Sequence, residues 1–397
     1  MKRPVLFILI GILLAIFSEI TFAHKASDSY LRFEINDGII QGRWDIALRD
    51  LDYAIGLDGD ADGHITWGEL RARHQAITNY AFTRLQITGD SAKCTSNLPD
   101  HLVDHHTDGA YAVLQFLVTC PETVNIFEIE YSLLFDLDPL HRGLLQVSYN
   151  QQIQTGIFSP EQQTVHLNLN KGSPWNEFIQ FGREGVWHIW IGYDHILFLI
   201  SLLFPSVLLW KAGRWHPQQS FRLALWEVLK IVTAFTLAHS ITLSLAVLGF
   251  VSLPTRWVES VIAASVIIVA LHNLYPVIQT RLWVMTFIFG LVHGLGFASV
   301  LIDLGLPGKS LALALAGFNV GVEIGQVVIV SIFTPLAFLV RGSWFYQRFI
   351  LNFGSLMIAF VALIWLIERS MNLDLVLMLD EWFLTHQSDS KMPGALQ

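Results

Sequence analysis

A series of long apolar runs occupies residues 185–370 and constrains the fold more than any other feature of this sequence. Each run is long enough to cross about 30 Å of hydrocarbon as an α-helix. Residues 24–180, by contrast, have the mixed composition of a soluble domain. The sequence therefore predicts an all-α bundle of six transmembrane helices after a soluble domain, with spans at 186–210, 224–249, 257–277, 282–302, 310–340 and 346–367.

The first 23 residues have the three parts of a secretory signal peptide, which are Lys2 and Arg3, an apolar stretch, and a small-residue site ending at Ala23. An uncleaved anchor helix is the alternative, and both interpretations export residue 24 onward. This predicts a multi-pass protein of the bacterial inner membrane, with residues 24–180 in the periplasm and residues 371–397 as a tail. The basic residues agree, because the expected inner loops carry more of them than the outer flanks: Lys211, Arg214, Arg222, Arg281, Arg341 and Arg348 against Arg183, Arg256, Lys309 and Arg369.

The exported part shows the alternation that is typical of β-strands. Residues 28–48 predict a β-hairpin with a turn at 36–38, and alternating runs recur at 112–118 and 124–133. We expect a β-rich, sandwich-like domain. Both cysteines of the chain, Cys94 and Cys120, lie here, where an oxidising compartment permits a disulfide; two separate buried thiols are the alternative.

Residues 58–69 match the twelve-residue calcium loop of an EF-hand, including a glycine for the sharp turn at Gly63. An acidic turn before a helix is the alternative, although three alternating aspartates repel one another without a cation. Only one such loop is visible, so we expect it to brace the β-rich domain rather than to signal. The expected calcium ligands are Asp58, Asp60, Asp62, the carbonyl of His64, Thr66 through a water, and Glu69.

Three further histidines, His101, His105 and His106, could form a metal-capture loop or lie in a solvated one. If cleavage follows Ala23, the amine and imidazole of His24 could chelate one ion. The chain has a net charge of −9 and lacks a basic stripe, a phosphate loop and an aromatic nucleic-acid motif, so nucleic acid is not an expected partner.

Polar residues inside the apolar runs are the strongest functional signal, because burying a charge in a membrane is costly. Imidazoles and carboxylates suit nickel, zinc, iron or copper(II), and no membrane cysteine offers a thiolate. For any single histidine, a hydrogen bond between helices is the alternative. The candidate metal residues are His188, Asp194, His195, His239, Glu259, His272, His293, Asn319 and Glu323.

Counting from the span ends places four candidates near the middle of the bilayer, namely His195, His239, His293 and Glu323. On a straight helix His188 and His195 are about 10 Å apart, so they are expected to act as successive stations, with His188 and Glu259 near the outer mouth. The glycine pairs 290/294 and 321/325 are expected to pack the fourth and fifth spans together.

Several of these residues stand in motifs that resemble the HupE/UreJ family, in the branch with a large exported domain. The motifs are His188-x5-Asp194-His195, Phe289-Gly290-Leu291-Val292-His293-Gly294, Ala238-His239-Ser240, His272-Asn273 and Phe318-Asn319-Val320-Gly321-Val322-Glu323. The resemblance spans residues 185–367, and the EF-hand-like insertion is similar to that branch too. Members of the better-known branch are viewed as nickel permeases that serve hydrogenase and urease. The resemblance therefore implies a metal-transporting membrane domain.

The chain departs from the fourth-helix signature of the better-known branch, Phe-His-Gly-x-[Ala/Val]-His-Gly-x-Glu. Phe289 stands where the first histidine would be, and Gly296 stands where the glutamate would be. His239, His272 and Glu323 could supply replacement ligands.

The leading hypothesis is a transition-metal permease, or a metal-binding membrane protein, for nickel or another divalent ion. The first alternative is a periplasmic receptor or assembly factor, anchored by the helices, with a protein partner that the sequence does not name. The second is a haem or electron-transfer protein with two histidine ligands. An enzyme is not expected, because no nucleophile–base arrangement or cofactor motif is visible. Membrane lipid and a divalent metal ion are the expected partners.

Overall fold

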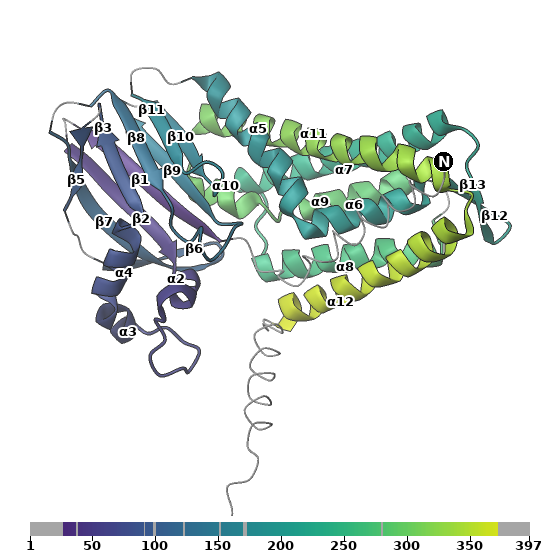
Figure 1. Cartoon of the computed structure of the whole chain (residues 1–397), viewed down its shortest axis with the longest axis horizontal. Helices are drawn as coiled ribbons and strands as arrows, with labels where there is room; N and C mark the ends of the chain where they lie inside the picture. Colours follow the sequence, from purple (N-terminus) through teal and green to yellow (C-terminus); the bar gives the residue numbers. More distant parts are fainter. Residues whose placement is uncertain are drawn as a thin grey trace, which may run out of the picture.

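The computed structural model describes residues 27–371, apart from 37–38, 91, 98–100, 122–123, 151, 170–172 and 279–280. A β-rich region (residues 27–168) lies at one end of a helical region (residues 174–371), whose long helices run away from it (Figure 1). The expected signal peptide, His24 and residues 372–397 of the tail lie outside the described residues.

Two sheets form the β-rich region. The larger has the strand order β10-β9-β1-β2-β7-β5, with β6 also paired to β7, and all of its neighbours are antiparallel except β1 and β9. Its strands are β1 (Asp28–Asn36), β2 (Ile39–Ala47), β5 (Thr95–Ser96), β6 (His101–His106), β7 (Gly109–Thr119), β9 (Arg142–Tyr149) and β10 (Gln152–Phe158). The smaller sheet has the order β11-β8-β3-β4, with β3 (Leu85–Gly89), β4 (Ala92–Lys93), β8 (Ile126–Tyr131) and β11 (Thr164–Asn168).

The two sheets enclose one apolar core. Alternation along β1 points Leu31 and Phe33 into this core, where they meet Phe127 and Ile129 of the smaller sheet. The predicted β-rich domain is thus confirmed, and β1 and β2 form the predicted hairpin, whose residues 37–38 lie outside the described part. The predicted disulfide between Cys94 and Cys120 is also confirmed.

Three short helices connect β2 to β3: α2 (Leu48–Ile55), α3 (Trp67–Ala72) and α4 (His74–Phe82). The acidic loop lies between α2 and α3. Thr66 ends the loop as the N-cap of α3, and the side chain of Glu69 returns to the backbone of Thr66 to complete a capping box.

Five helices of the helical region are long and apolar enough to cross a membrane, and a sixth span arises if one bent pair is counted as one. That pair is α5 (Pro174–Ile191) and α6 (Tyr193–Ser206), which meet at 68°. The others comprise α7 (Phe221–Val247), α8 (Thr255–Leu274), α9 (Leu282–His293) with α10 (Ala298–Leu304), α11 (Gly308–Val340), and the π-helix η1 (Tyr346–Phe353) with α12 (Gly354–Met371). A hairpin of β12 (Leu208–Lys211) and β13 (Arg214–Pro217) follows α6.

Small residues set the helix pairs, but not the pair that the sequence predicts. A Cβ at Gly290 on α9 would meet the Phe235 carbonyl of α7 at 2.7 Å, and Gly321 on α11 lies against Gly182 of α5. The predicted packing of the fourth span on the fifth is therefore wrong. The spacing of glycines shows that a helix face permits close approach, but the partner depends on the whole bundle.

Candidate metal centre

The break between α5 and α6 brings two of the predicted histidines together. The ring centres of His188 and His195 lie 4.5 Å apart, although these residues are about 10 Å apart on a straight helix. A Cβ at Gly192, in the break, would lie 2.6 Å from the His188 carbonyl oxygen and 3.0 Å from Nδ1 of His195. Only glycine fits there, and the prediction of two successive stations is wrong because it assumed an unbroken helix.

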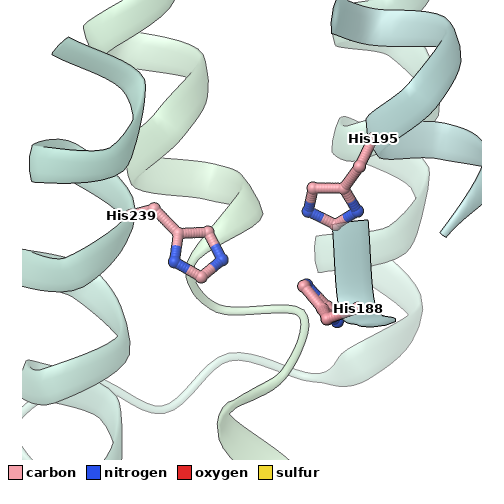
Figure 2. A group of neighbouring side chains, drawn as sticks. All are labelled: His188, His195 and His239. Atoms are coloured by element: carbon pink, nitrogen blue, oxygen red, sulfur yellow. The ribbon is translucent and has the colours of Figure 1, made fainter. Parts of the chain in front are cut away.

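His239 from α7 completes a group of three. One nitrogen each from His188, His195 and His239 lies within 4.8 Å of the others, and Figure 2 shows the three rings around a common space. His239 is fully buried, and His195 is 6% exposed. Nε2 of His188, Nε2 of His195 and both ring nitrogens of His239 are buried with no hydrogen-bond partner among the described residues.

His293, the last residue of α9, approaches the same space. Its ring centre lies 5.1 Å from that of His195, and it is fully buried. The Ser265 hydroxyl donates to the Ile262 carbonyl at 2.6 Å, so it can only accept from Nε2 of His293, at 2.9 Å. This bond places the ring proton on Nε2 and leaves a lone pair on Nδ1, which is buried and has no partner in the described part of the chain. We call His188, His195, His239 and His293 the histidine centre.

A carboxylate orients His195 within this centre. Nδ1 of His195 donates to Asp194 Oδ1 at 2.9 Å, which leaves a lone pair on Nε2 facing the other rings. Asp194 lies in the first turn of α6, where the helix dipole favours a negative charge, and Arg369 of α12 lies 3.9 Å from its other oxygen. Carboxylate–imidazole pairs of this kind fix the tautomer of metal-binding histidines.

Aromatic rings surround the histidine centre. The rings of Phe297 and Phe318 lie 4.9 and 5.2 Å from that of His188, and the Phe235 ring lies 6.3 Å from that of His195. Phe318 approaches because Gly185 of α5 sits directly against its carbonyl. An apolar lining of this kind excludes water from the polar atoms inside it.

The chain was compared with models of known protein families. The profile of a family described as HupE / UreJ protein matches residues 162–369. The chain belongs to the HupE/UreJ family. No curated protein sequence matches it significantly. Membership and the apolar helices together identify a multi-pass membrane protein, and they fit a membrane metal permease.

The HupE/UreJ match covers α5 to α12, which includes every member of the histidine centre. At the first departure from the better-known signature, Phe289 packs its ring 6.0 Å from that of Phe198. At the second, Gly296 lies in the turn after α9, and a Cβ there would meet Ile262 at 3.1 Å. In this member of the family both positions are filled by apolar packing.

Three other predicted metal residues lie apart from the three-histidine group, and a fourth, Asn319, approaches one of its members. Glu323 accepts a hydrogen bond from Thr233 at 3.3 Å on the other side of α7, and Nε2 of His272 contacts the backbone of Ile278 at the far end of α8. Asn319 bonds its own helix through Nδ2, while its Oδ1 is buried without a partner among the described residues and approaches His239. The backbone carbonyl of Glu259 accepts from Arg369 at 3.4 Å.

The acidic loop forms a second, separate group of oxygen atoms. Carboxylate oxygens of Asp58, Asp60 and Glu69 lie within 4.8 Å of one another. Gly63 has a φ of +81°, as the predicted sharp turn requires. Loop N–H groups donate to three of the carboxylates, from Gly59 to Glu69 at 2.7 Å, from Gly63 to Asp58 at 2.8 Å and from His64 to Asp62 at 2.7 Å.

Three residues that position the ligands are not among the predicted site residues. These are Gly192, Ser265 and Phe297. None of them carries an ionisable group, so none is predicted from the cost of burying a charge in a membrane. A glycine between two histidines seven residues apart was the one available signal of a broken helix. Nothing in the sequence around Ser265 distinguishes it from the other serines of α8.

Proposed function

We propose that the helical region carries a divalent transition-metal ion across the membrane and that the histidine centre is its binding site. The observation that carries this proposal is the convergence of buried, unpartnered ring nitrogens from α5, α6 and α7, with the ring of His293 from α9 5.1 Å from that of His195. Each buried polar atom left without a partner costs about 1–3 kcal/mol. A cation that accepts their lone pairs offsets this cost.

The donor set limits the class of ion. Four neutral imidazoles with a nearby carboxylate suit nickel, zinc, copper(II) or iron(II), whereas calcium and magnesium prefer oxygen donors. Because Cys94 and Cys120 form a disulfide in the β-rich region, the chain has no thiolate to select copper(I). Nickel remains the ion that the family resemblance suggests, although His293 is the one potential ligand of the three in the better-known signature that this chain keeps.

We place the β-rich region in the periplasm. Support comes from the disulfide, the predicted signal peptide and the larger number of basic residues in the opposite loops.

The test is metal accumulation by cells that express the full chain, together with equilibrium dialysis of the purified protein against Ni²⁺, Zn²⁺ or Co²⁺. His195→Ala and His293→Ala should each abolish accumulation and weaken binding. His216→Ala is the matched control, because His216 is an exposed imidazole on the β12–β13 hairpin. Accumulation that persists in both centre variants would rule out transport through this centre.

The acidic loop is proposed as a calcium site that braces the β-rich region. Besides its clustered carboxylates, Oδ1 of Asp58 is buried with no hydrogen-bond partner in the described part of the chain. The loop joins α2 to α3, so a bound cation would fix these helices relative to each other. Calorimetry of the full chain with Ca²⁺ tests this, and heat that is unchanged in Asp58→Ala would contradict it.

The two alternatives receive less support. A haem needs a flat space between two histidines, whereas Phe235, Phe297 and Phe318 fill the space around these rings. A receptor or assembly factor merely anchored by its helices would keep its function without the membrane histidines, so the same variants decide that question.

A further inference from the structure

The end of β6 and the turn that follows it connect the β-rich region to α10 through charged and polar side chains. His106 lies between two carboxylates, with Nε2 2.9 Å from Asp45 of β2 and Nδ1 3.7 Å from Asp303 of α10. The Thr107 hydroxyl donates to the same Asp303 carboxylate at 2.8 Å. Arg32 donates to the backbone carbonyl of Asp303, at the C-terminal turn of α10, where the helix dipole favours a cation. We call these five residues the latch.

His106 is the positive centre of the latch. Its ring stacks 4.8 Å from that of Tyr30 of β1 and lies 4.2 Å from that of Tyr111 of β7. Burial alone would lower the pKa of His106, but the nearby carboxylate of Asp303 and the hydrogen-bonded carboxylate of Asp45 outweigh it and raise the pKa to about 9. At neutral pH the imidazolium therefore joins one carboxylate of the β-rich region to one of the helical region.

Two arginines also contact the carboxylate of Asp45. Arg43 binds Asp45 at 2.7 Å and also reaches Asp104, and Arg32 lies 3.9 Å from Asp45. Asp45 is fully buried, so its charge depends on these partners. Among the charged residues described around His106, Asp303 is the one contributed by the helical region.

Helix α10 in turn reaches the histidine centre. Its N-cap is Phe297, whose ring lies 4.9 Å from that of His188 and stacks 4.3 Å from that of Phe318. Leu301 and Leu304 of α10 share one buried apolar cluster with Tyr30 and Tyr111 of the β-rich region. The 14 residues from 293 to 306 thus include His293 of the histidine centre, Phe297 over His188, and Asp303 of the latch.

The β-rich region also contacts α5, the helix that carries His188. Arg142 of β9 lies 3.6 Å from Glu184, and Arg183 donates to Gln162 at 3.0 Å. One attachment is to α5, which carries His188, and the other is to α10, whose N-cap is Phe297; Figure 1 shows the place of both helices.

We propose that the latch is a positioning device, through which the β-rich region holds α10 and keeps Phe297 over His188. The consequence for metal binding rests on the proposed function, whereas the mechanical link does not. Breaking the latch frees α10, removes the aromatic cover and lets water reach the ring nitrogens.

Hydrogen–deuterium exchange of the metal-free full chain tests the mechanical link. Asp303→Asn keeps the shape of the side chain but cannot pair its charge with His106. We expect exchange at residues 298–304 and 185–197 to rise about tenfold, as for the loss of about 1.4 kcal/mol, while α12 stays unchanged. Asp104→Asn is the matched control, because Asp104 is an exposed carboxylate that contacts Arg43 but not α10. Unchanged exchange at 185–197 in Asp303→Asn would overturn the proposal.

A pH series on the unaltered chain provides a test that does not depend on a variant folding. The pKa of His106 is raised above its ordinary 6.5, so its contribution to docking is fully present below pH 6.5 and is lost as pH rises through about 9. After correction for intrinsic exchange rates, protection of residues 298–304 should fall between pH 7 and 9.5. Protection that stays constant across this range would also overturn the proposal.

Ni²⁺ dialysis separates the two proposals. If the unaltered chain binds Ni²⁺, Asp303→Asn should weaken binding by about tenfold, the lower end of effects seen when groups behind metal ligands are removed. Equal affinity would overturn the role of the latch. If the unaltered chain binds no ion of the transition series, the proposed function fails, and the exchange experiments still decide the mechanical link.

Discussion

The histidine centre and the acidic loop are both candidate cation sites, but they differ in whether their polar atoms have hydrogen-bond partners when no ion is bound. The loop is largely exposed, and apart from Oδ1 of Asp58 its carboxylates accept hydrogen bonds from its own N–H groups, so it holds its shape alone. The histidine centre is buried, and five of its ring nitrogens have no partner within the described residues. The loop is therefore organised before a cation arrives, whereas the unpartnered nitrogens of the centre carry a free-energy cost that a bound cation removes.

The sharpest test of this contrast removes one unpartnered imidazole. His239→Leu should abolish transition-metal binding, with a loss of at least about 100-fold. It should also stabilise the metal-free protein by up to about 1–3 kcal/mol, because a buried polar group without a partner disappears. Dialysis measures the first effect and thermal unfolding in detergent the second. A variant that binds no metal and is also less stable would contradict the presence of this free-energy cost.

The next test changes the break that brings His188 to His195. Gly192→Ala should reduce metal affinity by about 10–100-fold, because its Cβ collides with the His188 carbonyl and moves both ligands. Overpacking of this kind also costs about 1–3 kcal/mol of stability. Gly308→Ala, on α11, is the matched control, since a Cβ there meets nothing. Equal losses in both variants would show that the break has no special role.

A smaller effect is expected from the tautomer of His293. Ser265→Ala removes the acceptor of the Nε2 proton, so Nδ1 no longer has a fixed lone pair, and affinity should fall by about tenfold. Ser260→Ala is the control, because its hydroxyl donates only to the Arg256 carbonyl of its own helix. Dialysis of both variants against the same metal decides whether the hydrogen bond matters.

The smallest effect is expected at the acidic loop. Calcium should raise the thermal midpoint of the unaltered chain by a few degrees, and Glu69→Gln should remove this shift without affecting Ni²⁺ binding. Hydrogen bonds from Thr66 and Gly59 lower the pKa of Glu69 to about 2, so the shift should persist at pH 5. Glu130→Gln, an exposed acid of β8, is the control. Loss of Ni²⁺ binding in Glu69→Gln would mean that the two sites are coupled.

The same contrast explains what the sequence could predict. The geometry of the acidic loop follows from residues at fixed spacing within twelve positions, so a local pattern is sufficient. The cost of polar atoms in apolar helices identified His188, His195, His239 and His293 as candidates. Their common location depends on the break at Gly192 and on which helices are neighbours, and neither is local.

The remaining wrong predictions concern which helices are neighbours in the bundle. Glu323 shares a helix with Asn319 and has the expected depth, but α11 packs on α5 and α7 and not on α9, so Glu323 meets Thr233 of α7 instead of His293. The latch joins residues about 200 positions apart in the sequence, as Thr107 and Asp303 do, and no periodicity relates them. Helix and strand positions were thus accessible from local signals, whereas contacts between elements required the folded chain.

The parallel pairing of β1 with β9 has a consequence for how the molecule is made. Asp28 aligns with Arg142, so strand β1, which pairs with β2 on one side, lacks its second neighbour until more than a hundred further residues have been synthesised. Strand β6 and its turn must then wait for α10, which is synthesised later still. The strands of the sheet therefore precede α10 in synthesis, and the contact of His106 with Asp303 can form only after α5 to α9 have been made.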